Sequence, residues 1–138
     1  GGILLLTFWI VFQLQKKKRI PALIPVVTID PYEEAMKQLE LLQQQNPEYN
    51  IYHTRLIDIH RRYVFRKKGI LSLQKTTTEL VVQLKVLNFS KEQFEKLTHA
   101  LQLSDLVKFA KYIPIDEDDK FVFETILYSI KIIEQSDN

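Results

Sequence analysis

Residues 48–68 read EYNIYHTRLIDIHRRYVFRKK and are followed by Gly69. The large apolar side chains of this stretch recur three and four positions apart, which is the spacing of one face of an α-helix. They are Tyr49, Tyr52, Leu56, Ile59 and Tyr63. Three cations end the stretch, where a helix favours positive charge, and glycine suits the left-handed position that follows a helix. The pattern predicts an amphipathic helix over residues 48–68.

A second helix is predicted just before this one, over residues 30–46. Asp30 can cap its start and Pro31 suits its first turn. Asn46 and Pro47 are typical of its end. Its apolar positions also recur three and four apart, and they are Tyr32, Ala35, Met36, Leu39 and Leu42. Two successive helices with one apolar face each indicate a helical bundle.

Two more helices are predicted after a short connector at residues 70–75, which is expected to be extended. Thr76 with Glu79 fits a capping box, in which a hydroxyl and a side chain three residues later satisfy each other's backbone N–H groups. Ser90 with Gln93 repeats the pattern. The sequence therefore predicts helices that begin after Thr76 and after Ser90.

The last two predicted helices lie on either side of Pro114. Residues 104–112, SDLVKFAKY, predict a short helix in which Leu106, Phe109 and Ala110 enter the core. The final helix begins in the acidic run 116–119 and continues to about residue 135. The expected fold class is all-α, a compact bundle of about six short helices that follows the end of a transmembrane helix.

The first residues indicate that the bundle is attached to a membrane. Residues 3–12, ILLLTFWIVF, form an apolar run that is followed by four cations. Hydrocarbon accepts such a run and rejects Lys and Arg, and an excess of cations favours the cytoplasmic side. The residues expected at the membrane interface are Trp9, Lys16, Lys17, Lys18 and Arg19.

The apolar run is shorter than the about 20 residues that a membrane-spanning helix needs. We therefore interpret residues 1–15 as the end of a transmembrane helix that starts upstream, and 16–29 as a basic, proline-containing junction. An amphipathic surface anchor is disfavoured because the run is apolar on all sides. A secretory signal carries its cations before the apolar core, not after it. Residues 30–138 are expected to form a cytoplasmic domain held at that membrane.

Composition excludes several classes of function. The chain has 138 residues and no cysteine, so disulfides, thiolate catalysis and cysteine-based metal sites are excluded. Its 19 cations and 17 acids give a net charge of +2, but four cations lie at residues 16–19. Residues 20–138 thus carry a net charge of −2. We expect no nucleic-acid partner, because such binding needs a positive field.

No catalytic, cofactor or metal site is predicted. His53 and His60 lie seven residues apart with Asp58 nearby, but the close spacing typical of zinc-binding helices is missing. We interpret both, and the isolated His99, as partly exposed helix histidines. No Ser/His/Asp arrangement stands out, although such triads are assembled in space and not in sequence.

Two charged clusters are candidates for contact with a partner or with lipid. The acidic cluster is explained in part by the positive end of a helix dipole, and it lacks the spacing of a calcium loop. The basic cluster could bind anionic lipid or an acidic partner. The acidic cluster consists of Asp116, Glu117, Asp118 and Asp119, and the basic cluster of Arg61, Arg62, Arg66, Lys67 and Lys68.

Four segments, in order, suggest a family: RRY at 61–63 leading to KGI at 68–70, TTTEL at 76–80, SDLVKFAK at 104–111, and Pro114 before the acidic helix. Together they resemble the C-terminal cytoplasmic helical region of bacterial membrane proteins encoded beside MoxR-type AAA+ ATPases and Bat (Bacteroides aerotolerance) proteins with von Willebrand factor A domains. The third segment is the most specific. The resemblance implies a single-span protein of the bacterial inner membrane with no known enzymatic activity. It also implies partners among the ATPase and the von Willebrand-type proteins.

The function predicted from the sequence is a non-enzymatic, membrane-tethered protein-interaction module without a cofactor. The alternative is a regulatory domain that binds anionic lipid or another ligand through the basic cluster. A hydrolase ranks third, and it requires a deep pocket with two titratable groups.

Overall fold

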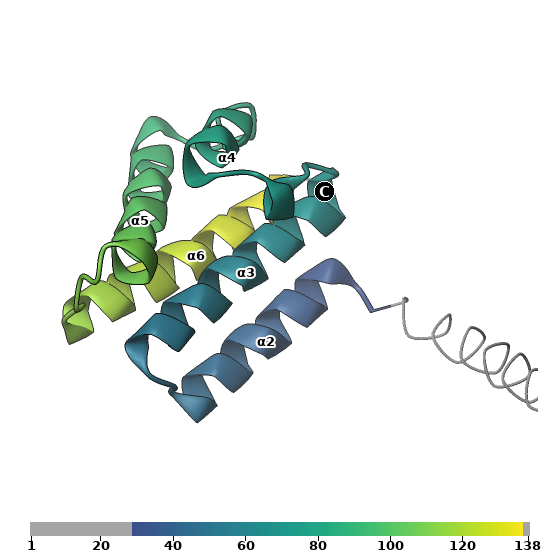
Figure 1. The fold of residues 1–138 in the computed structure, drawn as a ribbon. Coiled ribbons are helices and arrows are strands. Elements are labelled where there is room, and N and C mark those ends of the chain that lie inside the picture. Colours follow the sequence, from purple (N-terminus) through teal and green to yellow (C-terminus); the bar gives the residue numbers. More distant parts are fainter. Residues whose placement is uncertain (1–28, 137–138) are drawn as a thin grey trace, which may run out of the picture. The chain divides into compact units, whose positions relative to one another are not determined.

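Helix α3 (Tyr49–Lys68) is the element around which the others are arranged. The computed structural model of the chain describes residues 29–136. In this part α3 packs against helices α2 (Pro31–Gln45), α5 (Lys91–Phe109) and α6 (Asp116–Ser136), and against the short 3₁₀ helix η2 (Ser72–Gln74). Helix α4 (Thr77–Leu84) packs on α5. Figure 1 shows α2, α3 and α6 side by side, with α5 set at an angle to α3 and α6. The all-α prediction is confirmed for the described residues.

The bundle has two distinct ends. At one end, the start of α2 meets the end of α3, where Glu34 pairs with Arg66. Helix α6 also ends there, and its Glu134 pairs with Lys67 of α3. At the opposite end, α3 and α6 both begin and the α5–α6 connection crosses over (Figure 1). Helices α3 and α6 are therefore parallel, and α2 is antiparallel to α3.

The core lies between α3 and the helices that pack against it. Each helix contributes apolar residues three or four positions apart, as the sequence pattern predicts. Fully buried examples are Leu42 of α2, Leu56 of α3, Leu97 of α5 and Ile126 of α6. Burial of each such side chain stabilises the fold by about 1.5–3 kcal/mol.

The predicted helix ends are largely confirmed. Gly69 adopts φ of 72° and its N–H donates to the Phe65 carbonyl, as a left-handed C-cap does. Ser90 and Gln93 form a complete capping box, with reciprocal distances of 3.1 and 3.0 Å. The Thr76 hydroxyl accepts from the Glu79 N–H. The connector at 70–75, predicted to be extended, instead contains η2.

The prediction of six helices is wrong at one point. Residues 91–109 form one continuous helix, where two helices with a start at Ser104 were expected. Ser104 lies within α5, fully buried, and its side chain contacts α3 instead of capping a new helix. No proline or glycine interrupts the segment, so the helix continues through it.

The burial predicted for the end of α5 is also wrong. Leu106 is 48% exposed, Phe109 is 76% exposed and Ala110 is exposed as well. In the continuous helix, Ser104 and Val107 take the inward positions. Leu106 and Phe109 therefore lie on the outer side.

The first residue of α3 is more exposed than the sequence pattern predicts. Tyr49 belongs to the predicted buried stripe, but it is 43% exposed because it begins the helix at the end of the bundle.

The predicted transmembrane and junction segments, residues 1–29, fall almost wholly outside the described residues. Among residues 29–136, no helix has the length and apolar character that crossing a bilayer requires.

Candidate functional site

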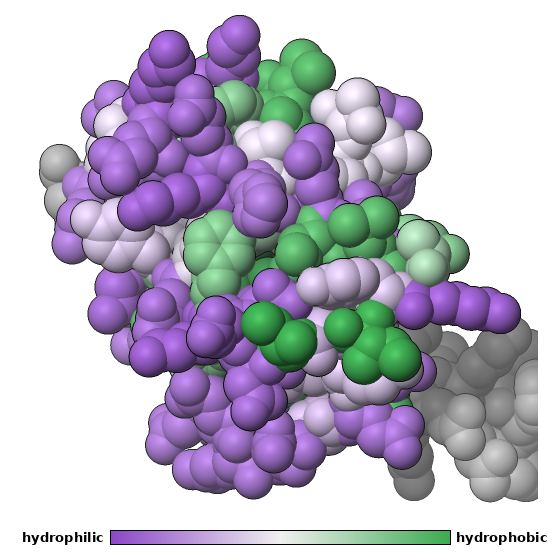
Figure 2. Space-filling model, turned by 90° about the vertical axis from the view of Figure 1, so that its left-hand side faces the viewer, coloured by the Kyte–Doolittle hydropathy of each residue, from purple (hydrophilic) through white to green (hydrophobic). Residues whose placement is uncertain are grey.

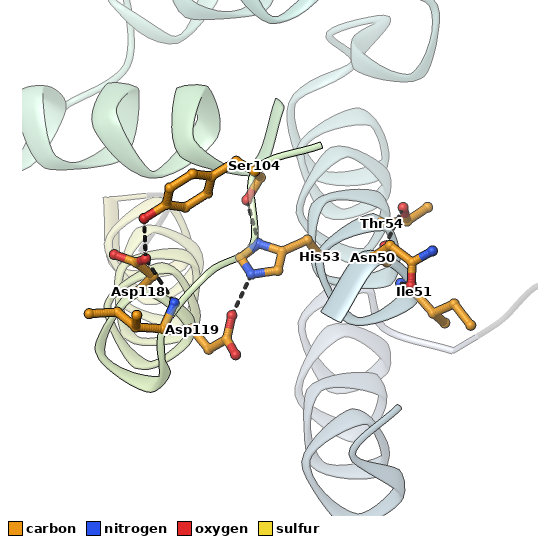
Figure 3. A network of polar contacts seen from close by, with 9 residues as sticks. Asn50, Ile51, His53, Thr54, Ser104, Asp118 and Asp119 are labelled. Carbon is orange, nitrogen blue, oxygen red and sulfur yellow. Dashed lines mark hydrogen bonds and ion pairs between the residues drawn. The ribbon is translucent and has the colours of Figure 1, made fainter. Parts of the chain in front are cut away.

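A polar network joins three helices at the end of the bundle where α6 begins. His53 of α3 lies with Nδ1 3.0 Å from the Ser104 hydroxyl of α5 and with Nε2 2.6 Å from Oδ1 of Asp119 of α6. Figure 3 shows the imidazole between these two partners. His53 and Ser104 are fully buried, and the Asp119 side chain is 32% exposed. The network is thus closed on the inside and reaches water only at Asp119.

Hydrogen-bond chemistry sets the donor between His53 and Asp119. A carboxylate only accepts, so Nε2 of His53 donates to Oδ1 of Asp119. The Ser104 hydroxyl donates to Nδ1 or accepts from it, according to whether Nδ1 carries a proton. Asp119 also contributes, after burial, to raising the pKa of the neighbouring Tyr52 to about 12.

The network contains the three residue types of a hydrolytic triad, but its surroundings suit a structural role. Ser104 is fully buried, so a substrate has no approach to its hydroxyl. It also lies within α5, where backbone N–H groups are committed to the helix and cannot form an oxyanion hole. The arrangement can hold α3, α5 and α6 together, and it gives the hydrolase alternative no support.

A second buried histidine lies two turns further along α3. Nε2 of His60 is 3.0 Å from the Ser129 hydroxyl of α6, and both residues are buried. Burial, followed by the charge of Arg61, lowers the pKa of His60 to about 4. The expectation that His53 and His60 are partly exposed is therefore wrong. Both occupy core positions and bond to serines of neighbouring helices.

The predicted basic cluster does not form one surface. The Arg61 guanidinium turns to the backbone and donates to the carbonyls of Ser72 and Lys75, which anchors the η2 segment. Lys67 pairs with Glu134, with Nζ 3.3 Å from Oε2. Arg66 and Arg62, in contrast, both contact Glu34 of α2.

The predicted acidic cluster is likewise divided. Asp118 accepts at Oδ2 from the Tyr112 hydroxyl, at 2.7 Å, and from the Ile115 N–H, at 3.1 Å. These bonds, the hydroxyl first, lower the pKa of Asp118. Asp119 bonds to His53, whereas Asp116 and Glu117 are exposed in the first turn of α6. Two of the four carboxylates therefore organise the helix start, and two face solvent.

Between Ser104 and the start of α6, the chain carries an exposed apolar surface, which we name the α5–α6 surface. It comprises the outer side of the end of α5 and the connection to α6. Figure 2 views this side of the molecule and shows hydrophobic side chains grouped among polar ones. The members of the α5–α6 surface are Leu106, Phe109, Tyr112, Ile113 and Ile115, each 38–76% exposed.

The backbone holds this surface in one shape. Lys111 adopts a left-handed conformation with φ of 56°, and the Tyr112 N–H donates to the Leu106 carbonyl. That bond ties the residue after the left-handed Lys111 back to the last turn of α5. With the two bonds to Asp118, it fixes the connection on both sides. The exposed side chains are therefore presented by an ordered turn.

Sequence reasoning missed the polar network, although a signal was present. His53, Leu56, His60 and Tyr63 follow the spacing of three, four and three, which places both histidines on the buried face of α3. Ser104 likewise continues the apolar spacing of α5. A histidine on such a face needs a buried polar partner, but the sequence alone did not show which serine or acid supplies it.

Two cavities lie elsewhere on the bundle. The larger cavity has a volume of about 530 Å³, lies between α5 and α6, and is lined by Phe89, Phe121 and Tyr128 among others. The smaller, about 320 Å³, lies between α2 and α3 and contains Arg62 and Arg66. No group of three or more potential metal ligands occurs within the described part of the chain.

Comparison of the chain with protein family models, with curated proteins and with solved structures found no match.

Proposed function

We propose that this chain is a non-enzymatic docking domain, tethered to the cytoplasmic face of a bacterial inner membrane, which binds a protein partner through the α5–α6 surface. The observation that supports the proposal most directly is the exposure of five large apolar side chains at the end of α5 and on the ordered connection that follows it. Soluble proteins seldom leave such groups together in water unless they bind something. Aromatic and aliphatic anchors of this kind dominate the energy of protein interfaces.

The charge beside the α5–α6 surface suits a protein better than a membrane. The surface lies at the end of the bundle opposite to Pro31 (Figure 1). Exposed Asp116 and Glu117 border the surface and disfavour anionic lipid headgroups. We therefore infer a protein partner with an apolar groove and cations at its rim.

The resemblance of the sequence names two classes of partner for the test: a MoxR-type ATPase and a von Willebrand factor A protein. A photo-reactive amino acid is placed at position 109 or 113 of the full-length protein in bacterial membranes. We expect crosslinks to one of these proteins. The same probe at position 86 is a matched control, because Val86 is 80% exposed just after the end of α4, outside the α5–α6 surface.

The side chains are then tested directly. Phe109→Asp is expected to reduce recovery of the partner by at least about tenfold, the loss typical of one interface anchor. Val86→Asp should leave recovery unchanged. Both positions face solvent, so both variants should keep the helical circular dichroism spectrum. Equal crosslinking from positions 86 and 109, or adducts with lipid alone, would contradict the proposal.

A further inference from the structure

We propose that the cavity between α2 and α3 binds a phosphate group. Its volume is about 320 Å³, and it lies beside the first turn of α2, which starts at Pro31. Its charged and apolar walls include the arginines Arg55, Arg62 and Arg66, the carboxylates Glu34 and Asp58, and Ile59. This site differs from the predicted basic cluster, since Arg61 and Lys67 are engaged elsewhere and Arg55 is added.

The charge of the cavity favours an anion. Three guanidinium groups face two carboxylates, which leaves one positive charge in excess. The side chains of Arg66 and Glu34 are only 23% and 21% exposed. In such a partly enclosed site, charges interact more strongly than on an open surface.

The contact at Glu34 shows how the cavity can hold an oxyanion. Nε of Arg62 lies 2.8 Å from Oε1 of Glu34, and Nη1 of Arg66 contacts Oε2. Two arginines that converge on adjacent oxygens of one anionic group form the arrangement that also suits phosphate, because each guanidinium presents a planar fork of donors. Glu34 is thus an internal counterion that competes with the ligand.

Arg62 can donate further hydrogen bonds to that ligand. Its Nε contacts Glu34, and its side chain is 63% exposed. Its two Nη groups have no partner among the described residues. Arg55, on the same wall, donates through Nη1 to Gln45 at 2.6 Å. A phosphate that enters the cavity can therefore accept hydrogen bonds from Arg62 while Glu34 stays in place. It can also accept from Arg66 when the Glu34 side chain moves away from that arginine.

Two sources supply this chemistry: a soluble phosphate and the phosphodiester of an anionic lipid headgroup. The lipid source rests on the proposed tether, because Pro31 lines the cavity and marks where the tethered chain enters the domain. The phosphate chemistry itself does not depend on the tether. The experiment therefore has a soluble arm and a membrane arm.

In the soluble arm, the full-length chain in maltoside micelles is titrated with inorganic phosphate and with glycerophosphoglycerol. The arginine Nε–Hε signals are followed by NMR. We expect a saturable shift of the Arg62 signal.

Arg66→Gln should weaken binding by about tenfold or more, as the loss of a charge-assisted contact does. Glu34→Gln should strengthen binding several-fold, because the internal competitor loses its charge. Lys131→Gln, at an exposed cation on α6, is the control and should change nothing.

In the membrane arm, the same signals are compared in nanodiscs of phosphatidylcholine and of phosphatidylglycerol. A shift only with phosphatidylglycerol or glycerophosphoglycerol assigns the site to a lipid headgroup, and a shift only with inorganic phosphate assigns it to a soluble ligand. The absence of any saturable shift, or a titration that Arg66→Gln leaves unchanged, overturns the proposal. Phe109→Asp should not alter the titration, so failure of this site is distinguishable from failure of the docking surface.

Discussion

Nε2 of His53 lies 2.6 Å from Oδ1 of Asp119, and this contact joins two residues that are 66 positions apart in the chain. It connects the second turn of α3 with the first turn of α6. The other ring nitrogen reaches Ser104 of α5, so one imidazole fixes three helices. The shape of the proposed docking surface therefore depends on a buried polar network.

Asp119 should contribute far more to stability than Asp116, although both lie in the first turn of α6. Asp119→Ala leaves a buried N–H of His53 without an acceptor, which costs about 1–3 kcal/mol. Asp116→Ala loses only its interaction with the helix dipole, about 0.3–1 kcal/mol. Urea unfolding of both variants measures the difference. Equal losses would mean that the contact between His53 and Asp119 contributes nothing specific.

Stability should fall in mild acid because of His60. Its pKa is about 4 in the folded chain and near 6.5 when unfolded. Between these values the unfolded state binds a proton that the folded state does not, so the free energy of unfolding decreases as pH falls from 6.5 to 4. Between pH 7 and pH 5 this group should remove about 2 kcal/mol.

The control for the pH effect replaces both members of the buried pair. In a His60→Leu, Ser129→Ala double variant, neither position carries a titratable or unpaired polar group. The difference in unfolding free energy between pH 7 and pH 5 should shrink by the share assigned to His60. An unchanged difference would show that other groups cause the acid sensitivity.

Arg61 and Arg62 are adjacent in sequence and should behave differently. Arg61→Ala removes the donor to the carbonyls of Ser72 and Lys75 and should cost about 1–3 kcal/mol. Arg62→Ala removes one largely exposed ion pair and should cost about 1 kcal/mol or less. Thermal or urea unfolding distinguishes the two. A larger loss for Arg62 would contradict the assigned roles.

Replacement of Lys111 by glycine should stabilise the fold. Its φ of 56° is unfavourable for a residue with a Cβ atom, and glycine adopts it without a steric penalty. Lys111→Gly is expected to raise the free energy of unfolding by up to about 1 kcal/mol. Gln102→Gly, at an exposed position inside α5, should lower it by about the same amount. A loss of stability in Lys111→Gly would argue against the left-handed turn.

The local features of this fold were predictable from sequence because neighbouring residues determine them. The capping box at Ser90 and Gln93 and the left-handed cap at Gly69 involve residues within one or two helical turns. The amphipathic period of α3 identified Leu56 and Tyr63 as buried, but it missed four further residues of the buried side, which are His53, Ile57, His60 and Val64. Such signals determine that helices form and where most of them begin and end.

The candidate site depended on contacts between distant segments. Ser104 has the chemistry of a helix cap, but it lies inside a continuous helix, and its hydroxyl contacts His53, 51 positions away. That continuity sets the rotation of the helix end and turns Leu106 and Phe109 outward. The sequence by itself determined an all-α chain with well-marked helix ends, because period and capping are local. Only the tertiary structure decided which serines and carboxylates meet the histidines and which apolar residues remain in water, because those outcomes depend on how whole helices pack.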